Sequence, residues 1–285
     1  MANIRIIRRR IRSIQNTAKI TKAMEMIAAS KMRRAQERAQ EGRPYTEKMN
    51  QVLADLAAQP QEGLLRHPLL ETREVNKIAI IHISADRGLC GGLNASVNRR
   101  TAGFILEQAA PVAVITVGRR GRDFVTRSEQ ELRAEFTQLG DRPALLDTLP
   151  ISRVVIDDYS NGYVDMVYLA YTQFVTTMTQ RPVISQLLPI EPADIPLAQN
   201  VEYIYEPSAG FVLEELLPRF VEMEVYHAIL EAIASEQSAR MVAMRNATDN
   251  ASEIVQDLTL LYNKARQDMI TKELLDLTGG AAALA

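Results

Sequence analysis

Apolar residues near both ends of the chain recur at intervals that alternate between three and four residues. In the C-terminal part the spacing runs through Phe220, Met223, His227, Leu230, Ala234, Gln237, Met241, Met244, Thr248, Ala251, Val255, Leu258, Tyr262, Ala265 and Met269. The N-terminal part repeats it over Ile4, Ile7, Ile11, Ile14 and Ala18, before Thr21 and Glu25 weaken the register. An average spacing of 3.5 residues is typical of the seam of a coiled coil.

Both ends also lack helix breakers, since residues 1–41 and 219–278 contain no Gly and no Pro. As helices they would extend about 60 and 90 Å, far longer than the three or four turns usual in globular domains. Charged residues interrupt every window, which excludes a membrane span. We therefore predict a long antiparallel coiled coil formed by residues 1–58 and 210–285. Gly42-Arg43-Pro44 is expected to punctuate the first of these helices.

The periodicity changes between the two ends, where short apolar runs alternate with helical segments. Strands are predicted at Ile78–Ile83, Val112–Val117, Leu132–Phe136, Val164–Val175 and Pro182–Leu188. Helices are predicted at about Asn94–Gln108, Arg119–Arg127 and Ile151–Tyr159. This alternation predicts the α/β class, with a mostly parallel, doubly wound, Rossmann-like domain over residues 75–205. The stretch from Pro192 to Pro207 is read as a connection into the last helix.

Composition allows one ordinary domain besides the long helices, because the chain has 285 residues and 47% of them are hydrophobic. The single cysteine, Cys90, excludes an internal disulfide and a cysteine-based metal cluster. His67, His82 and His227 have no carboxylate or cysteine at ligand spacing, so we interpret them as structural and predict no metal. The N-terminus lacks the apolar core of a signal peptide, which favours a soluble chain in a reducing compartment.

Charge is distributed unevenly along the chain. Residues 1–40 hold eleven Lys and Arg against Glu25 and Glu37, a net charge of +9, although the whole chain is at −2. Such a block indicates a solvated face, a nucleic-acid contact or a face toward acidic residues of the last helix, which include Glu222 and Glu231. Nucleic-acid binding is disfavoured, because no aromatic residues interleave with the cations and the pI is about 6.0.

A Gly-rich turn, DRGLCGGLN over residues 86–94, follows the first strand and suggests a nucleotide site. Its spacing matches neither GxGxxG nor GxxxxGK[ST], and no Lys follows it. We favour a structural turn in which Gly88, Gly91 and Gly92 permit close packing and Asp86 caps locally. No Ser-His-Asp or Cys-His set is evident, so the residues alone indicate neither an enzyme nor a cofactor.

Four blocks of sequence resemble the gamma subunit of rotary F-type ATP synthases. They are ITKAMEMIAASKMRRA at 20–35, DRGLCGGLN at 86–94, SEQSARMVAM at 235–244, and ITKELLD at 270–276 running into GGAAA at 279–283. The blocks occur in the family's order and span the chain. The resemblance implies a non-catalytic central rotor shaft that couples c-ring rotation to ATP synthesis from ADP and phosphate. It implies three alpha and three beta subunits, epsilon and the c-ring as partners, and no nucleic acid.

The resemblance also implies roles for individual residues. Arg266, Gln267 and Thr271 resemble a cluster that catches a beta-subunit loop. Met24, with Lys22 and Glu25 nearby, resembles the segment that faces the beta subunit's acidic lever and couples to Glu273 on the opposing helix. Tyr203 and Glu206 resemble the foot that touches the c-ring or epsilon.

One departure from the family's photosynthetic branch is informative. The chain lacks the insertion found in chloroplast and cyanobacterial gamma subunits, and with only Cys90 it excludes control by an internal disulfide. The length and the absence of a transit peptide fit a bacterial subunit held peripherally on the cytoplasmic side of the plasma membrane. A nucleotide-dependent enzyme and a basic, nucleic-acid-binding coiled coil remain the alternatives.

Overall fold

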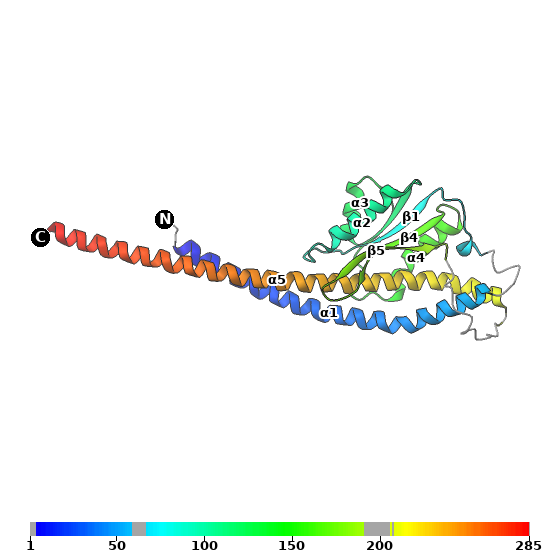
Figure 1. Ribbon diagram of the computed structural model, residues 1–285, viewed down its shortest axis with the longest axis horizontal. Coiled ribbons are helices and arrows are strands. Elements are labelled where there is room, and N and C mark those ends of the chain that lie inside the picture. Colours follow the sequence, from blue (N-terminus) through cyan, green and yellow to red (C-terminus); the bar gives the residue numbers. More distant parts are fainter. Residues whose placement is uncertain (1–3, 59–66, 191–205, 207, 285) are drawn as a thin grey trace. The chain divides into compact units, whose positions relative to one another are not determined.

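The computed structural model describes residues 4–58, 67–190, 206 and 208–284. Two very long helices, α1 (Ile4–Ala58) and α5 (Ala209–Leu284), enclose an α/β region in the sequence (Figure 1). The elements of that region follow in the order η2 (Pro68–Leu70), β1 (Ile78–Ile83), α2 (Leu93–Glu107), β2 (Val112–Val117), α3 (Arg119–Arg127), β3 (Glu131–Phe136), α4 (Leu145–Ser160), β4 (Met166–Phe174) and β5 (Gln180–Leu188).

Contacts divide the chain into two compact units. Residues 29–239 form the α/β unit, and residues 1–28 with 240–285 form the coiled-coil unit. Both long helices pass from one unit into the other. The unit boundaries therefore cut the helices, whereas the boundaries drawn from the sequence followed the helix ends.

The α/β unit is built on one five-stranded sheet with the order β3-β2-β1-β4-β5. The pairs of β1 with β2, β1 with β4 and β2 with β3 are parallel, which confirms the predicted doubly wound sheet. The last strand differs, because β5 runs antiparallel to β4 across the short turn around Thr176 and Thr179. A connection of that length cannot cross over the sheet, so it reverses the chain direction.

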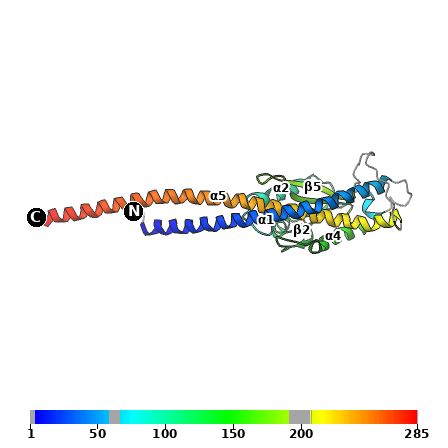
Figure 2. The ribbon, with the colours of Figure 1, turned by 90° about the horizontal axis from the view of Figure 1, so that it is seen from below.

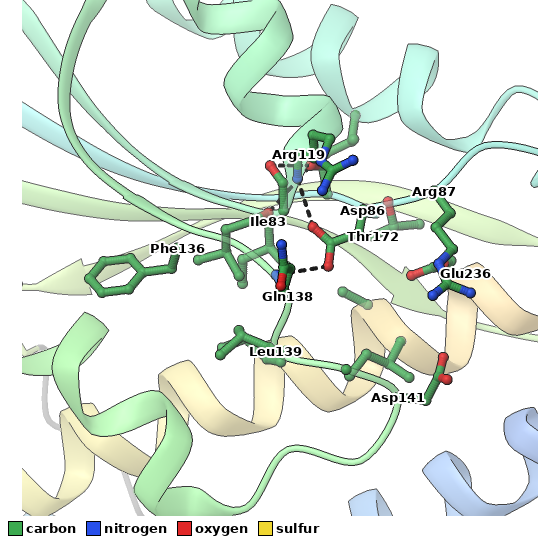
Figure 3. A pocket seen from close by; sticks show the side chains of 18 of the residues that line it. Ile83, Asp86, Arg87, Arg119, Phe136, Gln138, Leu139, Asp141, Thr172 and Glu236 are labelled. Atoms are coloured by element: carbon green, nitrogen blue, oxygen red, sulfur yellow. Dashed lines mark hydrogen bonds between the residues drawn. The ribbon is translucent and has the colours of Figure 1, made fainter.

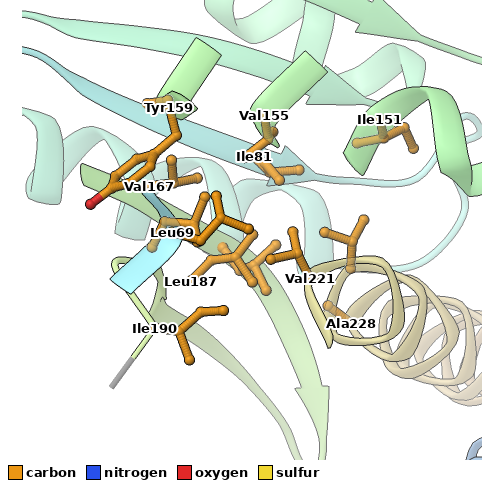
Figure 4. Close-up of a cluster of buried hydrophobic side chains, with 14 of the residues drawn as sticks. Leu69, Ile81, Ile151, Val155, Tyr159, Val167, Leu187, Ile190, Val221 and Ala228 are labelled. Carbon is orange, nitrogen blue, oxygen red and sulfur yellow. The ribbon is translucent and has the colours of Figure 1, made fainter. Parts of the chain in front are cut away.

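Alternate residues of the buried strands face two separate cores. Ile78 and Ile80 of β1 pack with Val125 of α3, on the face that α2 and α3 cover. Ala79 and Ile81 pack on the opposite face with α4 and α5, in the core that Figure 4 shows. Because both faces are covered, β1 and β2 are buried at every position, as expected for parallel strands between two helical layers.

Within the α/β unit, α5 buries a second stripe that the seam pattern did not predict. Its members recur every three or four residues and join the core under the sheet: Leu213, Leu217, Val221, Val225, Ala228 and Ile229. Leu230 and Ala234 of the predicted seam are buried as well. This part of α5 is therefore covered on more than one face, as befits a helix that belongs to a globular core.

The coiled-coil unit confirms the predicted seam and its antiparallel direction (Figure 2). Between residues 249 and 279 of α5, the described residues that are not exposed are Ala251, Val255, Leu258, Tyr262 and Ala265. The expectation that Thr21 weakens the register is wrong. Thr21 is buried, and its Oγ1 lies 2.7 Å from Oγ1 of Thr248 on the opposite helix. The hydrogen bond satisfies both hydroxyls, so the polar pair fits the seam.

Two predicted boundaries within the helices are also wrong. The helix α1 continues through Gly42 and Pro44, and α4 begins at Leu145 with Pro150 inside it. A proline inside a helix costs about 3 kcal/mol, which tertiary packing can offset. On the C-terminal side of Pro44, Met49 and Leu53 of α1 are buried in the core of the α/β unit.

Candidate functional site

The carboxyl ends of the parallel strands open onto a cavity of about 470 Å³ within the α/β unit. Its apolar lining includes Ile83, Val117 and Phe136 from the strand ends and Ile229 and Ile233 from α5. Its polar lining includes Asp86, Arg87, Arg119, Gln138, Asp141, Thr172 and Glu236 (Figure 3). Ligands of open α/β sheets bind at this edge, so a nucleotide, if the chain held one, would be sought here.

Asp86 accepts hydrogen bonds from the backbone N–H groups that a phosphate would need at this edge. One carboxylate oxygen accepts the backbone N–H of Arg119 at 2.9 Å, and the other accepts that of Gln138 at 3.0 Å (Figure 3). Since Arg119 is the first residue of α3, the protein's own carboxylate fills the anion position at this helix N-terminus. The prediction that Asp86 caps locally is wrong. The residue preceding α2 is Gly92, without a side-chain cap, and Asp86 instead ties together the loops that follow β1, β2 and β3.

The Gly-rich turn is packed against α3 and fastened to the end of β1. Gly91 has φ +59°, which favours glycine, and a Cβ on Gly88 would lie 3.2 Å from Arg120 Nη2. Gly92 has no such neighbour within 4 Å. Asn94 Oδ1 accepts the N–H of Ala85 at 3.1 Å, so the start of α2 is fastened to the end of β1. This geometry is that of a structural turn.

The buried histidine of β1 is a packing residue. His82 Nδ1 lies 3.0 Å from Thr101 Oγ1, and Nε2 lies 2.9 Å from Asn98 Oδ1, both on α2. Burial lowers the pKa of His82 to about 4, against a smaller opposing effect of the Asn98 hydrogen bond. His67 likewise serves structure, since its Nδ1 accepts the N–H of Leu69 and caps η2. Among the described residues, no group of three or more His, Cys, Asp or Glu could hold a metal ion.

The coiled-coil unit carries the residues predicted to contact partners. Arg8 donates to the hydroxyl of Tyr262, and its guanidinium lies 5.4 Å from the ring centroid. This register puts Ile4 opposite about Arg266, so that α5 continues for about five turns past the start of α1. The exposed side chains of Gln267, Thr271 and Glu273 lie on that extension.

Met24 and Glu273 are not brought together by the pairing. Thr21 lies against Thr248, which places half-buried Met24 opposite about Arg245. At 1.5 Å per residue, Glu273 is about 40 Å farther along the helix pair. If the two residues are coupled, the coupling does not run through a direct contact. Of the predicted foot, Glu206 is exposed, and Tyr203 lies outside the described residues.

Several residues to which the sequence analysis gave no docking role connect the long helices to the α/β region. Asp141, in the loop after β3, contacts Lys31 of α1 and Gln237 of α5. Ser235 and Ser238 of α5 donate to backbone carbonyls of Thr172 and Thr177. The available signal was the polar run SEQS inside an otherwise apolar stretch of helix.

No helix in the described ranges is both long and apolar enough to cross a membrane. Comparison with known proteins identifies the family. The sequence model of the ATP synthase family matches residues 3–284. An ATP synthase gamma chain of Dehalococcoides mccartyi is 66% identical over 285 residues, covering all of both chains. One from a Roseiflexus strain is 54% identical and covers all of this chain and 99% of its own.

A solved structure supports the same family assignment. The central stalk and c-ring structure of the mitochondrial ATP synthase of Tetrahymena thermophila contains a chain that matches with a TM-score of 0.62 and 25% identity. The match covers 80% of this chain and 99% of that one. With a family match over nearly every residue, gamma-chain relatives at full length and the fold of a central stalk, the chain belongs to the ATP synthase gamma chain family.

Proposed function

We infer that this chain is the central rotor stalk of a proton-translocating F-type ATP synthase and couples c-ring rotation to ATP synthesis from ADP and phosphate. The observation that carries the inference is the unpaired, apolar end of α5. On it Met269, Ile270, Leu274, Leu275 and Leu277 are each 41–71% exposed. Exposed apolar side chains gathered on one segment mark an interaction surface. A ring of three alpha and three beta subunits closing around this segment would bury it.

The shaft acts through contact, and the chain itself is non-catalytic in this proposal. A coiled coil of two unlike helices presents a different surface in each direction, so the three beta subunits around it meet different side chains. Rotation changes which beta conformation has the most favourable contacts, and energy is transferred as that difference in contact free energy. The chain needs no cofactor for this role.

Charge on α1 supports the same role. Arg8, Arg9, Arg10 and Arg12 are exposed, and of these Arg8 contacts Tyr262 of α5. The seam residues Ile7, Ile11 and Ile14 are apolar and less exposed. Glu222, one of the acidic residues considered as a partner for this block, pairs with Arg219 of its own helix at 3.1 Å. The basic face is therefore available to acidic surfaces of neighbouring subunits. Nucleic acid stays the less favoured partner.

Individual contacts follow from the family resemblance. Arg266, Gln267 and Thr271 would hold a beta-subunit loop near the end of the shaft. Met24 would face the beta subunit's acidic lever, and Glu273 would contact beta subunits at its own distant level. Tyr203 and Glu206 would meet the c-ring or epsilon at the foot. Membrane association would then be peripheral, on the cytoplasmic side of the plasma membrane and through the c-ring.

Purification of the tagged chain from its native membranes tests the proposal. We expect alpha and beta subunits to co-purify at three copies each per chain, together with epsilon and the c-ring. Inverted vesicles prepared from the same membranes should show ATP-driven proton uptake. Recovery of the chain without alpha and beta would refute the assignment. Tight nucleotide binding by the isolated chain, or salt-sensitive binding of DNA, would instead favour one of the two alternative functions.

Met24→Lys tests the coupling role of α1. The change places a new cation on a half-buried position of the helix pair. We expect ATP-driven proton uptake to fall further than ATP hydrolysis, both measured on the same vesicles. Equal loss of the two activities, or no loss of either, would remove Met24 from the coupling site. Crosslinking from Tyr203→Cys to the c-ring tests the foot in the same preparation.

A further inference from the structure

One carboxylate in the α/β unit contacts both long helices. Asp141 lies in the loop between β3 and α4, beside α5 and near α1 (Figure 3). Its Oδ2 accepts a hydrogen bond from Lys31 Nζ of α1 at 2.6 Å, and its Oδ1 accepts one from Gln237 Nε2 of α5 at 3.1 Å. We call these three residues the Asp141 clamp.

The ion pair of the clamp is itself exposed, and the buried amide of Gln237 distinguishes it from an ordinary surface pair. Gln237 is only 2% exposed, so its side-chain amide is out of reach of bulk water and depends on partners such as Asp141. The Lys31 and Asp141 side chains are about one third and less than one half exposed, respectively. A buried amide that donates to a carboxylate orients that carboxylate, because leaving the amide unpaired is costly. Asp141 is therefore fixed in place to receive Lys31.

The same turns of α5 are fastened to the sheet by two serines. Ser235 Oγ donates to the carbonyl of Thr172 at 2.9 Å, and Ser238 Oγ donates to that of Thr177 at 2.7 Å. Ser238 Oγ also accepts from Gln180 Nε2 at 3.3 Å. These bonds join α5 to β4 and to the start of β5. At this level α1 is contacted through Lys31 by the loop that carries Asp141, whereas Met49 and Leu53 of α1 are buried in the core farther along the helix.

The position of the clamp along the helices gives it mechanical significance. Lys31 lies three residues after Ala28, and Gln237 lies three residues before Arg240, and at these two residues the chain passes between the units in sequence. The clamp therefore grips both helices at the last turns that belong to the α/β unit. Met49 and Leu53 hold α1 in the core of the α/β unit farther along the helix. The clamp adds an attachment of α1 at the level where α5 is fastened to the sheet, so torque entering through the α/β unit reaches both helices at that level.

We propose that the Asp141 clamp is a positioning site for torque transfer, which locks the α/β unit to both helices of the shaft at the same level. This inference rests on the proposed rotor function. It assigns to Ser235-Glu236-Gln237-Ser238 the task of docking the shaft on the sheet. It assigns to Lys31 the task of bringing α1 into the same grip.

Charge exchange in the assembled synthase tests the proposal. Lys31→Glu and Asp141→Lys are made singly and together, and ATP hydrolysis, ATP-driven proton uptake and the amount of bound chain are measured on inverted vesicles. Each single change places like charges at the clamp, and we expect protons pumped per ATP hydrolysed to fall by about threefold or more. The double exchange restores an ion pair, and most of the ratio should return. Arg153→Glu, at an exposed position of α4, is the matched control and should leave the ratio unchanged.

Three results would refute the proposed role of the clamp. The first is an unchanged number of protons pumped per ATP in both single variants, and the second is a double exchange whose number is no higher than that of the worse single variant. The third is proton uptake that falls only in proportion to the amount of assembled chain. If the charge reversals do not assemble, Asp141→Asn decides. It keeps an oxygen acceptor for Gln237 and loses the charge that Lys31 needs, so its ratio must fall for the proposal to stand. Failure of wild-type vesicles to pump protons would refute the rotor function itself, which separates the two questions.

Discussion

Replacing Gly118 by alanine should be among the most damaging small substitutions in the α/β unit. Gly118 precedes α3 with φ +97°, and a Cβ there would lie 2.1 Å from the carbonyl oxygen of Ser84. That carbonyl cannot easily retreat. The Ser84 N–H donates to Val117 O at 2.8 Å, the Gly118 N–H donates to Phe136 O at 2.8 Å, and Ser84 Oγ accepts the N–H of Gly121 at 2.7 Å.

The cost has two parts. An alanine at this backbone conformation costs about 1–3 kcal/mol, and pushing apart two hydrogen-bonded loops adds about 1–3 kcal/mol. We therefore expect Gly118→Ala to lower the free energy of opening of the sheet by about 2–6 kcal/mol. Gly103→Ala is the matched control, since no atom beyond its own helix and immediate chain neighbours lies within 4 Å of its Cβ position in α2. It should stabilise the helix by about 0.5–1 kcal/mol.

Hydrogen exchange followed by mass spectrometry is the appropriate assay, because the long helices dominate the far-UV circular dichroism. Peptides that cover β1 and β2 should lose protection by about 30-fold to 10⁴-fold in Gly118→Ala, at roughly 1.4 kcal/mol per tenfold. The same peptides should be unaffected or better protected in Gly103→Ala. A change of less than tenfold in Gly118→Ala would refute the argument that Ser84 and Gly118 are locked together.

Two further predictions concern buried polar groups. Burial lowers the pKa of His82 to about 4, below its ordinary 6.5; the unfolded chain therefore binds the proton more tightly, and the contribution of His82 to stability is complete above pH 6.5 and is lost as the pH falls toward 4. Urea unfolding should show a loss of about 2–3 kcal/mol from this source between pH 7 and 4.5, and a His82→Gln variant whose pH dependence matches the wild type would contradict it. In the coiled coil, Thr21→Val should destabilise by about 1 kcal/mol, and adding Thr248→Val should cost little more, because the cross-helix bond is then removed from both sides. Thermal unfolding of the two variants checks this, and fully additive losses would mean that the 2.7 Å contact contributes nothing.

Most of the helices and strands could be predicted from the sequence, because the patterns that indicate them are periodic and local. The predicted bounds of Val112–Val117 and Arg119–Arg127 match those of the structure, because a mostly apolar run defines the strand and Gly118 separates it from the helix. The helix boundary at Gly42-Arg43-Pro44 failed for the opposite reason. Local propensity opposes a helix there, and burial of Met49 and Leu53 by residues distant in sequence favours it.

The site residues also differ in whether a local sequence signal marks them. The polarity of Gln267 and Thr271 on an apolar helix could be read directly, whereas the Asp141 clamp could not, because its three members come from α1, α5 and a loop more than ninety residues from either helical partner. Likewise, Asp86 reads as a local cap in sequence, yet its carboxylate bonds the backbone of Arg119 and Gln138, which only the parallel sheet brings near.

By itself, then, the sequence determined the two paired helices, the α/β domain between them and the family. The 3.5-residue seam, the short apolar runs and the blocks that resemble the family are each legible within a short stretch of sequence. Only the tertiary structure decided the level at which the helices pair and the distance between Met24 and Glu273. It alone decided which carboxylates join the shaft to the sheet. The physical reason is that such contacts depend on loop closure and packing over long sequence separations, and a polar side chain carries no local sign of the partner that it will find.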